Sequence, residues 1–221
     1  MRDLYHDELD AVGVSLLTMT QHARTAMERA TAALLDGNLA VAERVIGDDA
    51  AIDAIRADLE ERTFQLMARQ QPVAGDLRLL ITTLHLAADL ERMGDLALHI
   101  AKVARMRYPE IAVPGELRDV VAQMGEVALS LVDKVAEVIT GRDVVMAQAI
   151  EAEDDSMDAL HRKLFTLLLS PNWNHGTEAA IDMTLIGRYY ERYADHAVAV
   201  ARRIVFIVTG RMPEPLPASA V

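Results

Sequence analysis

Apolar residues recur along most of the chain at intervals of three and four positions, the spacing of an amphipathic α-helix. The pattern is interrupted where helix-breaking residues fall, at Gly37, Pro72, Pro109, Pro114, Gly141 and Pro171. The segments between these breaks predict six long helices. We place them at about residues 4–36, 38–69, 75–107, 116–140, 143–169 and 177–209.

The connections between these segments are short, and short connections make consecutive helices antiparallel neighbours. Asn38 is a suitable N-cap for the second helix, and Gly210 is placed to end the last one. We therefore predict an all-α fold of two tandem three-helix bundles related by internal duplication. The first bundle would cover residues 1–108 and the second residues 109–210, followed by a proline-containing, disordered tail over residues 211–221.

Composition agrees with packed helices and narrows the function. Of the 221 residues, 52% are hydrophobic and only 4% are aromatic, which favours helices over a sandwich or barrel. Cysteine is absent, which excludes disulfides and thiolate metal sites and fits a reducing compartment. The net charge of −12 argues against nucleic acid as a partner and suits cations or basic partners.

Targeting signals are not evident. No run approaches the roughly 18 apolar residues that a transmembrane helix needs. The N-terminus carries Asp3, Asp7 and Glu8 rather than a basic region followed by an apolar segment, so it does not resemble a signal peptide. We expect a cytoplasmic protein that meets a membrane only through its partners.

The same acidic element occurs twice, one hundred positions apart. Residues 91–95 read Glu-Arg-Met-Gly-Asp, and residues 191–195 read Glu-Arg-Tyr-Ala-Asp. A second acidic pair lies upstream of each element, at Asp49 and Asp53 in the first half and at Asp154 and Asp158 in the second. A chain that repeats such an arrangement is interpreted as one duplicated unit.

The register of the predicted hairpins brings the acidic pairs of each half to one level. The first two pairs centre on positions 51 and 93, and the midpoint of these positions is the break at Pro72. In the second half the midpoint falls within residues 171–176, which is again a turn. Carboxylates four residues apart share one helix face. Antiparallel packing should therefore line one groove in each bundle with four carboxylates.

Two interpretations of these grooves remain open from spacing alone. Acidic residues four apart on a helix usually belong to a solvated face, and Arg92 and Arg192 could neutralise them. Four carboxylates at one level, occurring twice, instead indicate metal sites with hard oxygen ligands. Such ligands suit Fe(III), Mn, Mg or Ca better than Zn. The candidate metal ligands are Asp49, Asp53, Glu91, Asp95, Asp154, Asp158, Glu191 and Asp195.

Other candidate chemistry is weaker. Di-iron sites of the ferritin type would require Glu-x-x-His, and the nearest match is Asp158-x-x-His161, so we expect no oxygen-activating core. His196 directly follows Asp195 but lies on a different helix face, and it is not assigned to the site. Gly94 lies near the apolar stripe and predicts a close approach of two helices there.

Several motifs together resemble those of the PhoU family of bacterial phosphate-signalling proteins. Residues 71–78, Gln-Pro-Val-Ala-Gly-Asp-Leu-Arg, resemble the segment that opens a helix in this family. Residues 90–101 and 190–196 resemble its repeated Leu-Glu-Arg-x-Gly-Asp element. The pairs Asp49/Asp53 and Asp154/Asp158 match its other acidic motif. The second half departs from the family pattern in lacking the Pro-Val-Ala-x-Asp-Leu-Arg opening.

The resemblance implies a function as well as a fold. It implies multinuclear metal clusters, iron first with Mn, Mg, Ca or Zn as alternatives, held by the eight carboxylates named above. It implies a negative regulator of the phosphate-starvation response. The partners would be the ATPase of the phosphate ABC transporter and the phosphate sensor histidine kinase, and the regulator would form a homodimer. Two alternatives are a metal-dependent phosphatase or oxidase that uses the acidic grooves, and a metal-free helical scaffold.

Overall fold

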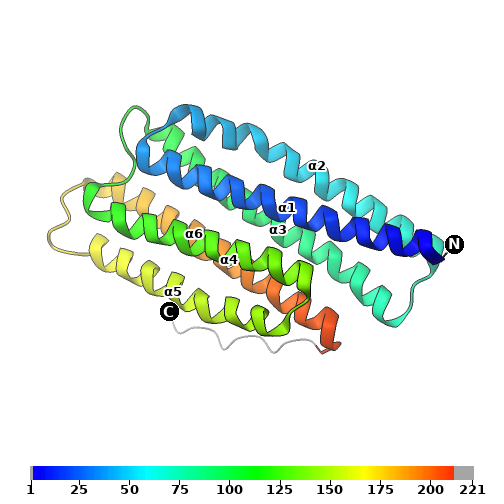
Figure 1. The fold of residues 1–221 in the computed structure, drawn as a ribbon. Coiled ribbons are helices and arrows are strands. Elements are labelled where there is room, and N and C mark those ends of the chain that lie inside the picture. The colour runs from blue at the N-terminus through cyan, green and yellow to red at the C-terminus, as the bar shows by residue number, and fades with distance from the viewer. Residues whose placement is uncertain (1, 212–221) are drawn as a thin grey trace.

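The helices end at the breaks in the apolar pattern. The computed structural model describes residues 2–211, except for the side chains of residues 2–4 and 6. Its elements, drawn in Figure 1, are α1 (Arg2–Asp36), α2 (Leu39–Gln70), α3 (Ala74–Arg107), η1 (Gly115–Leu117), α4 (Arg118–Gly141), α5 (Val144–Leu168) and α6 (Gly176–Thr209). No strand occurs in this range, so the all-α prediction is confirmed. Of the predicted tail, only Arg211 lies within the described residues.

Local chemistry sets the helix ends. The Asn38 side chain accepts a hydrogen bond from the backbone N–H of Val41 at 3.2 Å, as expected for an N-cap. Gly210 ends α6 with φ +71°. The fourth helix begins later than predicted, because the backbone N–H of Leu117 donates to the carbonyl of Pro114 at 2.9 Å. This bond closes a 3₁₀ turn before α4 starts.

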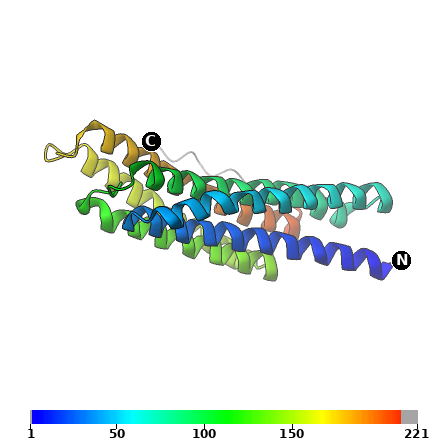
Figure 2. The same ribbon diagram turned by 90° about the horizontal axis from the view of Figure 1, so that it is seen from above.

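The six helices form two antiparallel bundles that lie side by side (Figure 1). Helices α1, α2 and α3 make the first bundle, and α4, α5 and α6 make the second. The bundles are offset along their common axis, so the α2–α3 turn projects beyond the second bundle at one end (Figure 2). No helix among the described residues has both the length and the apolar composition of a membrane span.

One continuous hydrophobic core runs through both bundles. Helices α1 and α3 of the first bundle contact α4 and α6 of the second, so these four enclose the centre, and α2 and α5 flank it. Two buried tyrosines of α6 reach α1: Tyr190 hydroxyl lies 2.7 Å from the Thr31 hydroxyl, and Tyr193 donates to the Ala23 carbonyl at 3.3 Å. The apolar faces of the helices are therefore buried between the two bundles as well as within each bundle.

Helices α3 and α6 run antiparallel to each other and are joined by ion pairs. Asp89 of α3 is nearly buried, and it accepts hydrogen bonds from Arg203 at 2.6 Å and from His196 Nδ1 at 3.1 Å, both on α6. At the other end of the contact, Arg107 of α3 pairs with the buried Asp182 of α6 at 2.5 Å. Buried carboxylates held this way fix how the two bundles sit together, since an unpaired one would be costly.

Gly94 marks the close helix approach that its position predicts. A Cβ added at Gly94 of α3 would lie 2.6 Å from Cδ1 of Ile52 on α2, a residue with 3% exposure. A larger residue here would displace the buried Ile52 side chain from its packed position between the two helices of the first acidic hairpin. By contrast, Gly47 on α2 has nothing within 4 Å of its added Cβ.

Replacing Gly94 with valine is therefore expected to destabilise the protein by about 1–3 kcal/mol, the usual cost of overpacking a core. Gly47→Val is the matched control and should change the free energy of unfolding by no more than about 0.5 kcal/mol, because it lies on an exposed helix face. Urea unfolding of the three proteins measures the difference. Equal effects of the two substitutions would contradict the close packing of α2 on α3.

Candidate functional site

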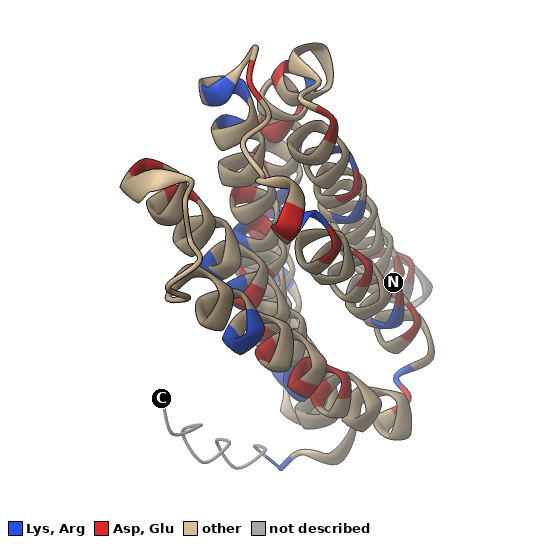
Figure 3. Ribbon diagram, turned by 90° about the vertical axis from the view of Figure 1, so that its left-hand side faces the viewer, with Lys and Arg blue, Asp and Glu red and all other residues tan. Residues whose placement is uncertain are grey.

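The eight candidate carboxylates lie on the two hairpins, with one acidic pair on each of α2, α3, α5 and α6. In the first bundle Asp49, Glu91 and Asp95 are half-buried, and Asp53 is exposed. Charged positions of both signs occur on both bundles (Figure 3), so the acidic sites are local clusters on a mixed surface. What distinguishes them is how the carboxylates of neighbouring helices act on one another.

In the first bundle, carboxylates of α2 and α3 lie within electrostatic range of each other. Partial burial raises the pKa of Asp49, and the nearby charges of Asp95 and Asp53 raise it further. The pKa of Glu91 is also raised, first by burial and then by Asp95, while Arg56 opposes the shift. Carboxylates from both helices therefore lie close enough to act on one another, as the register about Pro72 requires.

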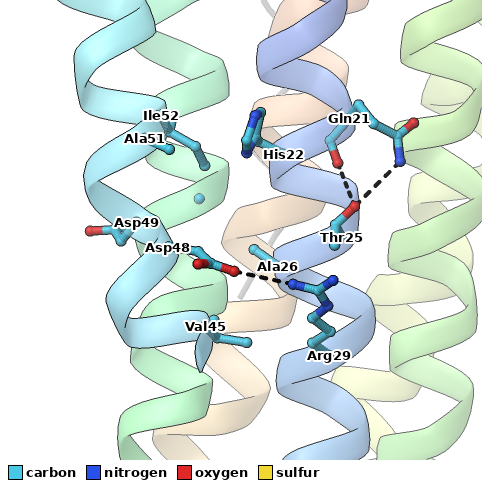
Figure 4. A pocket seen from close by; sticks show the side chains of 11 residues that line it. Gln21, His22, Thr25, Ala26, Arg29, Val45, Asp48, Asp49, Ala51 and Ile52 are labelled. Atoms are coloured by element: carbon cyan, nitrogen blue, oxygen red, sulfur yellow. Dashed lines mark hydrogen bonds and ion pairs between the residues drawn. The ribbon is translucent and has the colours of Figure 1, made fainter. Parts of the chain in front are cut away.

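Asp48 and Asp49 are neighbours in the chain but face different sides of α2. The Asp48 carboxylate is turned toward α1, where it pairs with Arg29 at 3.1 Å, whereas Asp49 points away from α1 (Figure 4). Between α1 and α2 lies a cavity of about 310 Å³, with His22 and Ile52 among the residues that line it. Of the two, only Asp49 lies near the α3 carboxylates. Adjacent residues point to different sides of a helix, so Asp48 pairs with α1 and Asp49 belongs to the candidate site.

The second bundle concentrates negative charge more strongly. Burial raises the pKa of Asp154 to about 7, and the charges of Asp195, Asp158 and Glu191 contribute in that order. Loss of hydration against the packed helices also raises the pKa of Glu191 and of Asp195. A carboxyl group half protonated near neutral pH binds a proton or a cation readily, because its ionised form is destabilised by burial and by the neighbouring negative charges.

One substitution between the repeats accounts for part of this difference. Arg56 follows Asp53 by three positions and pairs with Glu91 at 3.2 Å. The equivalent position in the second repeat, three after Asp158, is His161, whose pKa is lowered mainly by burial. Its Nε2 is buried and has no hydrogen-bond partner among the described residues. The second site therefore has a neutral imidazole where the first has a guanidinium.

Arginines pair with some of the acids but do not neutralise each cluster in the same way. Arg92 pairs with Asp95 at 2.7 Å, as one interpretation of the sequence expects. Its counterpart Arg192 forms no ion pair within 4.0 Å among the described residues, and Arg188 pairs with Glu191 instead. Sequence spacing did not identify Arg188, because its repeat equivalent is Ala88 and no motif marks it.

The donor set fits a hard cation. Every candidate ligand supplies carboxylate oxygens, and ionised carboxylates that repel each other are stabilised by a multivalent ion. Within residues 2–211, however, no three Asp, Glu or His side chains already converge on a single point as ligands of one ion would. Binding would require these flexible side chains to turn away from their arginine partners and toward the ion.

His196 is the second residue that sequence reasoning left out. It lies beside Asp195 in the chain, but its ring is directed to α3, where Nδ1 bonds to Asp89. Its role is to connect the two bundles next to both acidic sites. Since the partner lies 107 positions away, only the packing of α3 on α6 reveals this contact.

The burial of Asp154 among other carboxylates predicts a pH-dependent stability. The pKa of Asp154 rises from 3.8 to about 7 on folding, so the folded state holds the proton more tightly than the unfolded state. The protonated group therefore contributes to the free energy of unfolding in full below about pH 4. This contribution is lost as the pH rises through 7. Asp154→Asn removes this loss. In metal-free buffer, urea unfolding should show the variant more stable than the parent at pH 8, with a smaller difference at pH 5.

Glu137→Gln is a suitable control, because Glu137 is exposed on α4 away from the grooves. It should show no such pH-dependent gain. A constant difference between Asp154→Asn and the parent across this pH range would mean that the second cluster is fully hydrated and uncrowded.

The chain is similar to known proteins over nearly its whole length. Residues 16–104 and 121–204 match the PhoU domain model, one match in each half. The chain is 49% identical over 213 residues to the "phosphate-specific transport system accessory protein PhoU homolog 2" of Mycobacterium tuberculosis, covering 96% of this chain and 100% of the relative. It is 48% identical over 214 residues to "PhoU homolog 1" of Mycobacterium leprae, covering 97% and 96% respectively.

Solved structures agree with these matches. The "phosphate transport system regulatory protein PhoU" of Streptococcus pneumoniae superimposes with a TM-score of 0.86 at 25% identity, covering 96% of this chain and all of the other. PhoU of Pseudomonas aeruginosa gives a TM-score of 0.84 at 26% identity, covering 94% of this chain. Sequence and fold thus lead to one conclusion: the chain belongs to the PhoU family.

Proposed function

We propose that this protein is a non-enzymatic negative regulator of the phosphate-starvation response. It acts with the phosphate ABC importer and its ATPase, couples that importer to a sensor histidine kinase, and so controls phosphate uptake. The support is that relatives matching nearly the whole chain are named accessory proteins of the phosphate-specific transport system. The protein works in the cytoplasm, as a homodimer, and reaches the membrane through these partners.

We further propose that each acidic groove binds metal, with iron as the first candidate. The observation that carries this proposal is the placement of partly buried carboxylates close to one another across each hairpin; in the second, burial and then the charges of the neighbouring acids raise the pKa of Asp154 to about 7. A bound cation would offset that repulsion and brace α2 against α3 and α5 against α6. The two sites are not equivalent, since Glu91 is paired by Arg56 from the neighbouring helix α2, whereas Glu191 is paired by Arg188 of its own helix α6 and His161 holds the position of Arg56.

Elemental analysis of the purified protein tests the ligands. Asp49→Ala combined with Glu91→Ala should remove the metal of the first site, and Asp154→Ala combined with Glu191→Ala that of the second, because each pair takes one carboxylate from each helix. Asp48→Ala is the matched control, since this neighbour of Asp49 faces α1 and should keep full metal content. Unchanged metal content in both double variants would reject these ligands.

The regulatory role has a separate test. In the source organism, deletion of the gene is expected to release phosphate-regulated phosphatase activity even when phosphate is plentiful, because repression would lose its mediator. Reintroducing the wild-type gene should restore repression. Phosphatase output that stays repressed after deletion, in a strain without a second gene of this family, would argue against a negative regulator.

A further inference from the structure

A cavity of about 270 Å³ lies between α3 and α6, at the contact of the two bundles. It lies beside the acidic grooves between α2 and α3 and between α5 and α6, and it shares Asp95 with the first of them. Its polar lining consists chiefly of basic side chains from both helices. These are Arg92 and His99 of α3, and Arg188, Arg192 and His196 of α6, with Asp95 as the acidic member.

The charge of this lining is opposite to that of the whole protein. Three guanidinium groups and one carboxylate border the cavity, on a chain with a formal net charge of −12. Arg92 pairs with Asp95 at 2.7 Å and Arg188 pairs with Glu191, but Arg192 has no ion pair within 4.0 Å among the described residues. Cations gathered around one space repel each other, so an anion placed there would be favourable.

Internal duplication explains why the arginines meet. Arg92 and Arg192 hold equivalent positions in the two repeats, and both line this one cavity. Since α3 and α6 pack antiparallel, the cavity lies where the equivalent points of the two helices cross. Each repeat thus contributes its own copy of the same arginine, and the lining is complete only when the two bundles dock.

The lining supplies the kinds of donor that a tetrahedral oxyanion needs. A guanidinium group presents paired N–H donors that match two oxygens of a phosphate. His99 is held by stacking on Tyr189, with ring centroids 5.2 Å apart, and His196 is held through Nδ1 by Asp89 at 3.1 Å. The volume is below the roughly 300–1,000 Å³ of pockets for larger organic ligands, which favours a small ion.

The geometry points to a binding site for a small tetrahedral oxyanion, inorganic phosphate, in the α3–α6 cavity. Arg192, which forms no ion pair within 4.0 Å among the described residues, is its main ligand, and Arg92 and Arg188 are further donors. That phosphate bound here would be sensed rests on the proposed regulatory function, whereas the binding of phosphate does not depend on it. Arg92 and Arg188 have side chains exposed by 63% and 54%, so the ion can enter directly from solvent.

Equilibrium dialysis with labelled inorganic phosphate tests this site on the full chain in chelator-treated buffer at fixed ionic strength. We expect saturable binding of one phosphate per chain. Arg192→Gln should weaken it by roughly ten- to a hundredfold, the effect of losing hydrogen bonds to a charged group. Arg44→Gln is the control, because Arg44 is exposed on α2 and does not line the cavity; it should leave the affinity unchanged.

Three results would overturn the assignment: no saturable binding to the parent protein, equal affinity in Arg192→Gln, or displacement of phosphate by chloride at constant ionic strength. Circular dichroism of each variant confirms folding, which is expected because Arg192 is exposed. Normal phosphate binding in a protein whose deletion leaves repression intact would reject only the regulatory role. Absent binding in a protein that restores repression would reject only this site.

Discussion

The antiparallel packing of α3 on α6 is the contact on which the rest of the molecule depends. These two helices lie between the bundles, and each carries one acidic pair of its own hairpin. The buried carboxylates Asp89 and Asp182 fix their register through Arg203, His196 and Arg107. Because a charged group without its partner would be costly in this interface, the two repeats have few ways to dock.

Much of the fold could be predicted because its determinants are local. Apolar spacing and helix breakers specify each helix separately, and the turn at Pro72 sets the level at which α2 meets α3. The acidic grooves follow from the same register, since rotation about a helix axis is fixed by which residues are buried. Asp49 and Asp48 illustrate this: adjacent in the chain, they face different neighbours, and the apolar stripe through Ile52 decides which faces α3.

What could not be predicted lies between the bundles. No periodic signal states whether two bundles lie side by side or end to end, because both arrangements bury apolar surface. The contact of His196 with Asp89 and the meeting of Arg92 with Arg192 around one cavity depend on that choice. Arg188 was also missed, since it has no equivalent in the first repeat, where the neighbour of the acidic element is Arg56 on another helix.

The acidic grooves and the basic cavity are linked by shared arginines. Arg92 and Arg188 line the cavity, yet each is held by a carboxylate of a groove, Asp95 in the first bundle and Glu191 in the second. A cation in a groove would take over these carboxylates and release the guanidinium groups toward the cavity. An anion in the cavity would draw the same arginines away and leave the carboxylates free for a cation. Each ligand would then favour the other by an equal free energy, as linkage requires.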